Sequence, residues 1–497
     1  MNRLQAFHRN VGEPQEQYKG ASEIKEASGR RTFGIRQRKR RTYGVPAAVG
    51  QVHSSDEGSE SCRSKGAWLL QFYTGKQPER ERLEMKVNVE KTVPISFKEV
   101  ADAYAVARQG GKASGIDHES WMDFEVNLEK NLYVVWNRLA SGSYFPQPVR
   151  LKMIPKPDGK QRKLGIPTIR DRIAQQVLKA RMEPRCESIF SPNSYGYRPG
   201  RSARQALETV QRNTRQYDWV IDLDISKFFD EIDHELLMKA VETVTSEKWM
   251  LMYIRRILEA PEEDEQGNLH SREGRGTPQG GVISPLLANL FLHYALDRWL
   301  EIYHPQCRFT RYADDVVIHC RTLPDAQNLM VAVKERMTTV KLRVNEVKSK
   351  IAYCKDSNRR GEHEHISFKF LGFQFQPRTV RNMKSGKLFQ SFMPAISNDN
   401  QTKIKESIRT TVYWHSTCQS LELIAEVLNS KLRGWVGYFA AFGKTVFRKT
   451  MCYLQEKLAG WIKRKYKLLG NIQCWHRLKE LMKVNPNLFY HWEMGYV

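Results

Sequence analysis

Two adjacent aspartates, Asp314 and Asp315, interrupt an otherwise apolar stretch and are the residues of this chain best suited to chemistry. Charged pairs are rarely placed inside such a stretch unless a cation neutralises them. The flanking residues 309–312 and 316–318 favour two short strands joined by a tight turn. Such a turn would present both carboxylates at one point, as a divalent-metal site requires.

A second carboxylate-bearing strand is predicted at 220–225. Side chains alternate along a strand, so Asp222 and Asp224 would share one face. Extension of a nucleic acid chain uses two metal ions roughly 3.5–4 Å apart, held by bridging carboxylates. Mg²⁺ prefers octahedral oxygen coordination and suits carboxylates together with phosphate. Either segment alone is a weak signal, but together they indicate a nucleotidyl-transfer centre with two Mg²⁺ ions, and hence a polymerase.

The composition indicates a polyanionic partner. The 497 residues carry a formal net charge of +25, which a long nucleic acid would explain and a small-metabolite enzyme would not need. A generally basic surface is the alternative. No apolar stretch approaches the ~20 residues of a membrane span, so we expect no membrane partner. The eight cysteines are scattered, without zinc-ligand spacing. This pattern is typical of reduced thiols in the cytoplasm.

Three regions are expected along the chain. Residues 1–85 form a basic, polar extension that we expect to be disordered, serving either as an RNA-wrapping arm or as a solvated tail. Residues 86–380 show a mixed pattern of helices and strands, including a hairpin formed by 150–154 and 162–166. Residues 381–497 read as basic amphipathic helices.

The chain resembles the group II intron-encoded reverse transcriptases/maturases. The Tyr-Ala-Asp-Asp sequence at 312–315 is similar to that family's signature, and Asp224 followed by Phe229 is similar to its first catalytic aspartate and aromatic sugar gate. Further similar blocks follow in family order, at 110–117, 154–168, 171–176, 194–202, 275–285, 342–350, 370–373 and 430–439. The resemblance covers about 95 to 440. It implies an α+β right-hand polymerase fold, with fingers and palm on an antiparallel sheet, then an α-helical thumb or maturase "X" domain.

The resemblance also implies site residues. Asp224, Asp314 and Asp315 would hold two Mg²⁺ ions, with Ile225 beside them in the metal site. Asp222 competes with Asp224, but only Asp224 has an aromatic residue at the gate position, and we interpret Asp222 as structural. For the incoming deoxynucleotide, the expected residues are Lys156, Arg162, Phe229 and Gln279. Each has an ordinary alternative: solvated hairpin charges, a core aromatic and a turn residue.

The remaining expected residues serve nucleic acids. Leu371 and Gly372 would form a turn gripping the primer end, with a plain strand turn as the alternative. The residues expected to bind RNA interleave cations with an aromatic and are Arg433, Trp435, Lys463, Arg464 and Lys465. A buried aromatic seam is the alternative for Trp435. The expected partners are group II intron RNA, an RNA template with a DNA primer, and dNTPs. The oligomeric state is left open.

The chain departs from many relatives in one respect. These carry an HNH-type nuclease with a Cys-x-x-Cys pair after the X domain, and this sequence has no such pair. We therefore expect no target-DNA cleavage by this chain, and priming by another DNA end. The implied setting is a bacterial cytoplasm, at the nucleoid when the protein acts on DNA. Two other roles stay open: a host-recruited reverse transcriptase in phage defence or repair, and a maturase that only assists splicing.

Overall fold

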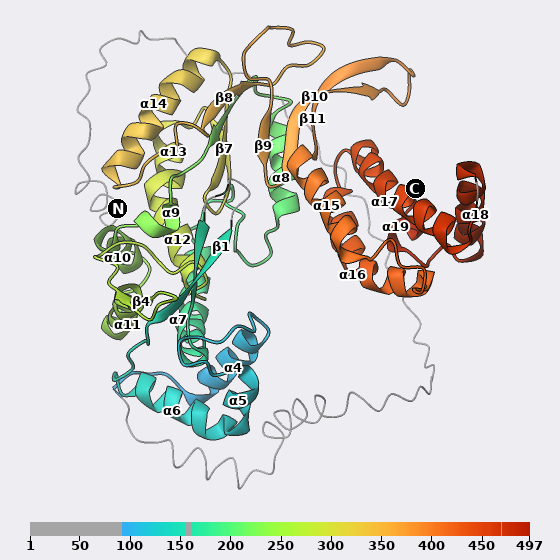
Figure 1. Cartoon of the computed structure of the whole chain (residues 1–497). Helices are drawn as coiled ribbons and strands as arrows, with labels where there is room; N and C mark the ends of the chain where they lie inside the picture. The colour runs from blue at the N-terminus through green and yellow to red at the C-terminus, as the bar shows by residue number, and fades with distance from the viewer. Residues whose placement is uncertain (1–91, 156–158, 160, 469) are drawn as a thin grey trace, which may run out of the picture. The chain divides into compact units, whose positions relative to one another are not determined.

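The computed structural model describes residues 92–155, 159, 161–468 and 470–497 (Figure 1). The predicted basic extension at 1–85 lies outside the described residues, and so does Lys156.

The described chain begins with helices that support the fingers. They are α4 (Phe97–Arg108), α5 (Trp121–Val126), α6 (Leu128–Ala140) and the long α7 (Ile169–Glu187). Ser96 and Ser120 begin α4 and α5 with capping boxes, in which the serine hydroxyl accepts from the third helical N–H group. The apolar face of α4 recurs at helical spacing and packs on α6 and α7.

The fingers hairpin is present where the sequence predicts it. β1 (Val149–Pro155) pairs with β2 (Gln161–Ile166) in an antiparallel register that places Ile154 opposite Arg162. Two short strands, β4 (Glu262–Glu263) and β5 (Leu269–His270), extend the sheet in the order β2-β1-β4-β5.

A four-stranded antiparallel sheet forms the palm. Its order is β6 (Arg308–Tyr312), β7 (Asp315–Cys320), β3 (Trp219–Leu223) and β8 (Lys350–Tyr353). Helix α8 (Ala203–Asn213) packs on β6, and α14 (Leu323–Thr339) packs on β3 and β7. These helices explain why β3 and β7 are buried almost throughout, rather than at every second residue.

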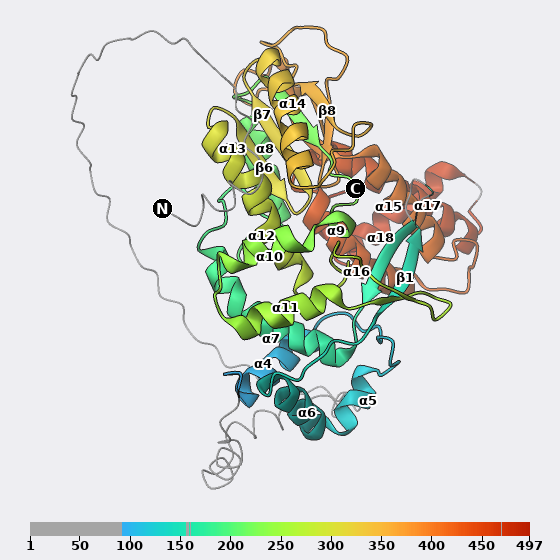
Figure 2. The same ribbon diagram turned by 90° about the vertical axis from the view of Figure 1, so that its left-hand side faces the viewer.

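Further helices connect the fingers to the palm strands. They are α9 (Phe228–Glu231), α10 (His234–Glu242), α11 (Lys248–Glu259), α12 (Ser284–Leu292), the π-helical turn η1 (His293–Asp297) and α13 (Arg298–Tyr303). Figure 2 shows α10, α11 and α12 beside the long helix α7, and packing contacts join α10 to α11 and α12, and α12 to α7. A π-helical turn within a helix is unusual and often marks a functional site.

Strands continue beyond the expected start of the helical region at 381. β9 (Phe368–Phe370), β10 (Phe373–Arg381) and β11 (Leu388–Ile396) form a three-stranded sheet in the order β11-β10-β9. The base of this sheet buries the aromatic rings of Phe368, Phe375 and Phe392 against one another. The change from strands to helices therefore lies after Ile396.

The thumb is helical, as expected for the X domain. Its helices are α15 (Asn398–Thr411), α16 (Leu421–Phe439), α17 (Lys444–Lys465), α18 (Asn471–Val484) and α19 (Tyr490–Glu493). Helix α16 directs an apolar stripe at helical spacing into one core shared with α17 and α18. Among the helices of the described ranges, none is long and apolar enough to cross a membrane.

Candidate active site

The Tyr-Ala-Asp-Asp sequence forms the tight turn that was predicted between two strands. β6 and β7 are joined through Ala313 and Asp314, and Tyr312 pairs with Asp315 to close the hairpin. Ala313 has a left-handed backbone with φ of 56°. This conformation costs a non-glycine residue about 1–2 kcal/mol, so the surrounding structure must hold the turn in place.

A buried arginine supplies that support. Arg311 is fully buried and pairs with the equally buried Asp297, with Nε donating to Oδ1 at 2.7 Å and Nη2 to Oδ2 at 2.5 Å. Its Nη1 donates to Oδ1 of Asn289 at 2.8 Å and to the carbonyl oxygen of Ala313 at 3.1 Å. Asp297 is the last residue of the π-helical turn. Arg311 therefore ties the turn at 313–314 to η1 and α12.

The segment around Gly196 closes the other side of the turn. The N–H group of Tyr195 donates to the carbonyl oxygen of Arg311 at 2.8 Å. A Cβ atom on Gly196 would lie 2.4 Å from the backbone nitrogen of Ala313. Only glycine permits this approach, which gives the predicted 194–202 block a physical reason.

The third predicted carboxylate, Asp224, follows the end of β3. Nδ2 of Asn345 donates to its Oδ2 at 2.9 Å, and Nζ of Lys348 lies 3.7 Å from the same oxygen. The N–H group of Asp224 donates to the hydroxyl of Ser349 at 3.0 Å. Ile225 is buried and forms a backbone bridge with Val344. The loop before β8 thus positions both Asp224 and Ile225.

The carboxylates of the palm influence one another's ionisation. The side chain of Asp315 reaches solvent, but desolvation by the protein around its carboxyl raises the pKa to about 7; the charges of Asp314 and Asp224 add to this, and Lys348 opposes it. Burial also raises the pKa of Asp314, as does the charge of Asp224, against the opposing charges of Arg162 and Arg311. Asp224, Asp314 and Asp315 therefore form one electrostatic cluster that lacks a sufficient counter-charge.

Asp222 belongs to the same electrostatic neighbourhood. Burial raises the pKa of its carboxyl to about 7; the charge of Lys350 opposes this, and the charges of Asp315 and Asp224 add to it. Asp222 lies within β3, opposite Val317 and Lys350, rather than at the strand end. It adds negative charge behind the three aspartates.

The donor set fits a hard divalent cation. Carboxylate oxygens are the ligands that Mg²⁺ prefers, and each carboxylate with a raised pKa would gain from a nearby positive charge. Within 92–497, apart from the undescribed positions, no group of three or more His, Cys, Asp or Glu side chains is close enough to hold a metal ion. Metal binding would therefore draw the carboxylates closer together.

The fingers hairpin meets the palm through two predicted nucleotide-binding residues. Nε of Arg162 donates to Oε1 of Gln279 at 2.7 Å, and the N–H group of Gly165 donates to the carbonyl oxygen of Gln279 at 2.9 Å. Gly280 has φ of +130°, and a Cβ atom there would lie 2.3 Å from the carbonyl oxygen of Gly165. The charge of Arg162 also lowers the pKa of Asp314. The hairpin therefore places this cation near the turn that carries Asp314.

Phe229 lies on the short helix α9. Its carbonyl oxygen accepts from the N–H group of Thr277 at 2.8 Å, which fixes α9 against the loop that carries Gln279. Its neighbour Phe228 is 2 % exposed, and the two rings are 5.3 Å apart. Phe229 is only partly buried. Phe228 is therefore the ring of this pair that packs in the core, and Phe229 is the more accessible one.

Leu371 and Gly372 form the predicted tight turn between β9 and β10. Both have left-handed backbones, with φ of 47° and 81°. The hydroxyl of Tyr438 on α16 donates to the carbonyl oxygen of Leu371 at 2.8 Å, and Nδ2 of Asn400 on α15 donates to that of Gly372 at 3.0 Å. Burial raises the pKa of Tyr438 to about 12, with contributions from Tyr312 and Asp315. Thumb residues thus hold the turn of Leu371 and Gly372 within electrostatic reach of Asp315.

The thumb residues predicted to bind RNA do not lie in equivalent environments. The exposed Arg433 lies over the ring of Tyr490, and Trp435 packs against the thumb core. The cations at the end of α17 make hydrogen bonds within the thumb: Lys463 to Asn471, Arg464 to the carbonyl oxygen of Trp414, and Lys465 to that of Gln419. These three cations therefore help to hold the thumb together.

Several residues that build this site were given no role in it by the sequence, although Asn345 and Tyr438 stand in the predicted blocks 342–350 and 430–439. They are Arg311, Asp297, Asn289, Asn345, Ser349 and Tyr438. Arg311 adjoins the Tyr-Ala-Asp-Asp motif, and a charged residue inside a predicted buried strand was a signal for it. Asp297 and Asn289 carried no such signal, because their role depends on a tertiary contact.

Two family profiles match the chain. The profile "Reverse transcriptase (RNA-dependent DNA polymerase)" matches residues 154–375, and "Group II intron, maturase-specific domain" matches residues 401–481. The first begins at the end of β1 and covers the palm with all three aspartates, and the second covers most of the thumb.

The chain is also similar to individual proteins. Protein YkfC of Escherichia coli (strain K12) is 33% identical over 291 residues, which cover 50% of this chain and 75% of YkfC. The group II intron-encoded protein LtrA of Lactococcus lactis subsp. cremoris is 32% identical over 257 residues, 50% of this chain and 41% of LtrA. A telomerase structure from Candida albicans has a TM-score of 0.39 at 12% identity, over 74% of this chain and 68% of that one.

The fold is the α+β polymerase fold followed by a helical X domain, with the palm carboxylates on its central sheet. On this evidence, the chain belongs to the group II intron-encoded reverse transcriptases/maturases.

Proposed function

We propose that this chain copies intron RNA into DNA at a centre built from Asp224, Asp314 and Asp315. The observation that carries the proposal is the electrostatic cluster of these three aspartates, in which desolvation and, secondly, neighbouring negative charges raise the pKa values of Asp314 and Asp315. Two bound Mg²⁺ ions would activate the primer 3′-hydroxyl and hold the triphosphate. The aspartates would supply the charge that attracts these ions.

The surrounding residues have distinct roles in this proposal. Arg162 would neutralise triphosphate charge with paired N–H donors, oriented by its hydrogen bond to Gln279. Phe229, held against the Gln279 loop, would exclude a ribose 2′-hydroxyl by its bulk. Leu371 and Gly372 would contact the primer end on a turn that Tyr438 and Asn400 hold in place. The partners would be an RNA template with a DNA primer, and dNTPs.

Assistance to splicing of group II intron RNA is the second proposed activity. It would use the RNA-binding surface of the thumb, because the intron supplies its own catalytic groups. The match of residues 401–481 to the maturase-specific domain supports this role. The protein would meet its RNA and DNA partners in the cytoplasm of a bacterium, at the nucleoid.

Primer extension on an RNA template tests the polymerase proposal. The wild-type chain should make DNA from dNTPs in the presence of Mg²⁺ and should reject rNTPs. Asp314→Ala should lower the rate at least a hundredfold, because loss of several kcal/mol of metal-dependent stabilisation slows a reaction about tenfold per 1.4 kcal/mol. Glu335→Gln, which changes an exposed carboxylate on α14, is the matched control and should match the wild type.

The same variants separate the two activities. Asp314→Ala should still assist splicing of its cognate intron as well as the wild type does. Absence of DNA synthesis by folded wild-type protein at saturating template would overturn the polymerase proposal and leave a splicing-only maturase. Splicing assistance that fails together with synthesis in Asp314→Ala would contradict their separation.

A further inference from the structure

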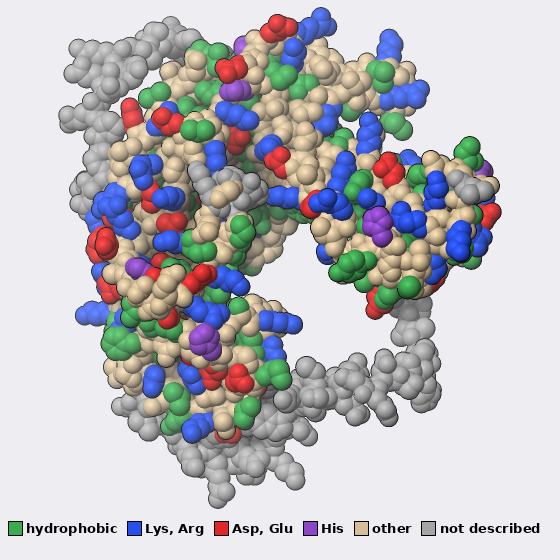
Figure 3. Space-filling view, in the orientation of Figure 1, with side chains coloured by type: hydrophobic (Ala, Val, Ile, Leu, Met, Phe, Trp, Pro, Cys, Tyr) green, Lys and Arg blue, Asp and Glu red, His purple; other side chains and the backbone are tan. Residues whose placement is uncertain are grey.

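The distal half of the β10–β11 hairpin, residues 381–390, is exposed along its whole length among the described residues. We call these residues the ribbon tip. Strand β9 pairs only with Phe373–Phe375 at the base, and every residue of the ribbon tip is exposed. Met383 is 94% exposed and Leu388 71%. In Figure 3, Lys and Arg side chains and hydrophobic side chains gather at the end of this hairpin. Large exposed apolar side chains grouped with cations indicate a binding surface.

The charged side chains of the chain segment around the ribbon tip are all positive. Residues 366–398 contain five cations, Lys369, Arg378, Arg381, Lys384 and Lys387, and no Asp or Glu. Lys369 pairs with Asp399, and Arg378 donates to the carbonyl oxygen of Met393 across the hairpin. In the described part of the chain, no ion pair involves Lys384 or Lys387. These two lysines are therefore available to an anionic partner.

Hydrogen bonds at both ends hold the ribbon tip in a fixed conformation. At the far end, the N–H group of Asn382 donates to the carbonyl oxygen of Lys387 at 2.9 Å, and that of Gly386 donates to the carbonyl oxygen of Asn382 at 2.8 Å. At the near end, the N–H group of Gln390 donates to Oγ of Ser357 at 2.8 Å. A surface ordered before binding loses less entropy when its partner binds.

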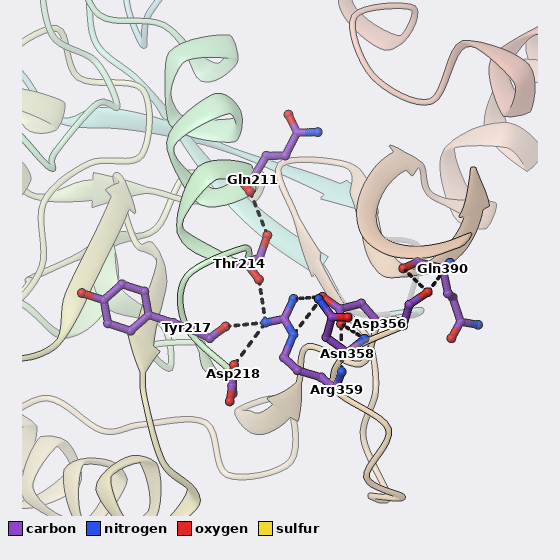
Figure 4. Close-up of polar contacts among 9 residues, drawn as sticks. Gln211, Thr214, Tyr217, Asp218, Asp356, Asn358, Arg359 and Gln390 are labelled. Carbon is purple, nitrogen blue, oxygen red and sulfur yellow. Dashed lines mark hydrogen bonds and ion pairs between the residues drawn. The ribbon is translucent and has the colours of Figure 1, made fainter. Parts of the chain in front are cut away.

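The loop that carries Ser357 is itself anchored to the palm. Figure 4 shows Arg359 between this loop and the end of α8, where its Nη1 donates to the carbonyl oxygens of Thr214 at 2.9 Å and Tyr217 at 3.0 Å. Its guanidinium also pairs with Asp356. Hydrogen bonds thus connect the palm to Arg359, and the loop of Arg359 and Ser357 to Gln390. They attach the near end of the ribbon tip to the palm.

We propose that the ribbon tip binds the backbone of structured RNA, with Lys384 and Lys387 on phosphates and Leu388 and Met383 against the sugars. The inference rests on the proposed function for the identity of the partner. A-form RNA has a wide, shallow minor groove that displays riboses, whereas its narrow major groove excludes side chains. Exposed apolar residues between cations match a surface of riboses flanked by phosphates.

This contact is separate from the predicted thumb surface. The reverse transcriptase profile ends at residue 375 and the maturase profile begins at 401, so the ribbon tip lies in neither. The ribbon tip would therefore add a contact to RNA beyond those predicted for Arg433 and the cations of α17.

RNA binding as a function of salt concentration tests the proposal, with a stem–loop RNA that carries no primer as the probe. Lys384→Ala combined with Lys387→Ala should weaken binding about tenfold near 0.1 M salt and reduce the slope of log K against log salt by about two. The same pair changed to Arg should bind as the wild type does. Lys98→Ala combined with Lys130→Ala, two exposed lysines on the fingers helices, is the charge-matched control and should leave affinity and slope unchanged.

Leu388→Ser tests the apolar part of the surface. It should weaken binding of the stem–loop severalfold without changing the salt slope, because it removes contact with sugars but no phosphate contact. A DNA duplex of the same sequence should bind more weakly and respond less to the lysine changes, since it lacks the 2′-hydroxyl and the shallow groove.

The outcomes distinguish this inference from the proposed function. An unchanged salt slope in the double alanine variant, at wild-type melting temperature, overturns the ribbon inference. Equal loss in the fingers control also overturns it, because general charge would then explain the effect. A wild-type protein that binds RNA through the ribbon tip but makes no DNA would refute the polymerase proposal alone.

Discussion

The turn at 313–314, which carries Asp314, and the ribbon tip are each the end of an antiparallel hairpin, but one lies against buried protein and the other is exposed. The β6–β7 hairpin is buried, and its turn is tied to a fully buried arginine-aspartate pair. The β10–β11 hairpin ends in ten exposed residues, and its lysines form no ion pair within the described part of the chain. The first hairpin holds carboxylates close together against their mutual repulsion, whereas the second leaves its lysines accessible. If both proposals hold, DNA synthesis would depend on buried polar contacts, and RNA binding on accessible charge.

The largest expected effect comes from breaking the buried pair. Arg311→Met would leave Asp297 as a buried, unpaired charge and should lower the free energy of unfolding by about 3–5 kcal/mol. DNA synthesis should fall with it, because Ala313 loses the hydrogen bond that holds its carbonyl oxygen. Denaturant unfolding and primer extension are the measurements. Lys384→Met at the ribbon tip is the control and should change stability by no more than about 0.5 kcal/mol.

A compensating change sharpens this result. Arg311→Met combined with Asp297→Leu removes both charges, so part of the lost stability should return while synthesis stays low. Arg311→Lys should also synthesise poorly, because an ammonium group cannot make the paired contact. Wild-type synthesis by Arg311→Lys would contradict a positioning role for the guanidinium.

Replacing one glycine at each hairpin end by alanine compares the two hairpins directly. Gly196→Ala would bring a Cβ atom to 2.4 Å from the backbone of Ala313, and such overpacking typically costs about 1–3 kcal/mol. Synthesis should fall at least tenfold, because the turn must move. Gly386→Ala at the ribbon tip meets only the far end of Arg381, at 3.6 Å, and should cost about 1 kcal/mol for its left-handed backbone. Its melting temperature should change little, and equal effects of the two substitutions on synthesis would refute the comparison.

The carboxylate cluster should make stability depend on pH in the absence of metal. The pKa of Asp315 rises from its ordinary 3.8 to about 7 in the folded protein, so folding disfavours the charged form. Its contribution to stability is therefore fully present below pH about 4 and is lost as the pH rises through about 7. In EDTA, Asp315→Asn should melt at a higher temperature than the wild type at pH 8, and the difference should shrink at pH 5.

Magnesium and a second carboxylate check this interpretation. Mg²⁺ at pH 8 should raise the melting temperature of the wild type more than that of Asp315→Asn, because the ion supplies the missing counter-charge. Glu335→Gln should show no pH-dependent difference from the wild type. A lower melting temperature for Asp315→Asn than for the wild type at pH 8 would contradict the repulsion.

The sequence predicted those parts of the site that depend on local pattern. The apolar flanks of Asp314 and Asp315 predicted their hairpin. The preference for Asp224 over Asp222 rests on the family resemblance and stays a prediction. The partners of Arg311 were not predicted, because Asp297 lies 14 residues earlier on a π-helical turn that no periodicity indicates. Contacts of this kind depend on the tertiary fold, whereas strands and turns depend on neighbours in the chain.

The same distinction explains the boundary after the palm. Strand β11 lies where helices were expected. The strand was not predicted because its sequence contains Pro394 and lacks a regular alternation of polar and apolar residues. The hydrogen bonds of Lys463, Arg464 and Lys465 were also missed, because a run of cations carries no information about the carbonyl groups near it. Their assignment to RNA binding remains a prediction.

The smallest expected effects separate the thumb cations by what they contact. Arg464 donates to the carbonyl oxygen of Trp414 at 2.6 Å, so Arg464→Ala should lower the free energy of unfolding by about 1 kcal/mol. Arg433 is exposed over the ring of Tyr490, so Arg433→Ala should leave stability within about 0.5 kcal/mol and reduce the salt slope of RNA binding by about one. Thermal unfolding and RNA titration at several salt concentrations measure both. A loss of stability in Arg433→Ala with an unchanged salt slope would show that accessible charge does not mark the RNA surface of the thumb.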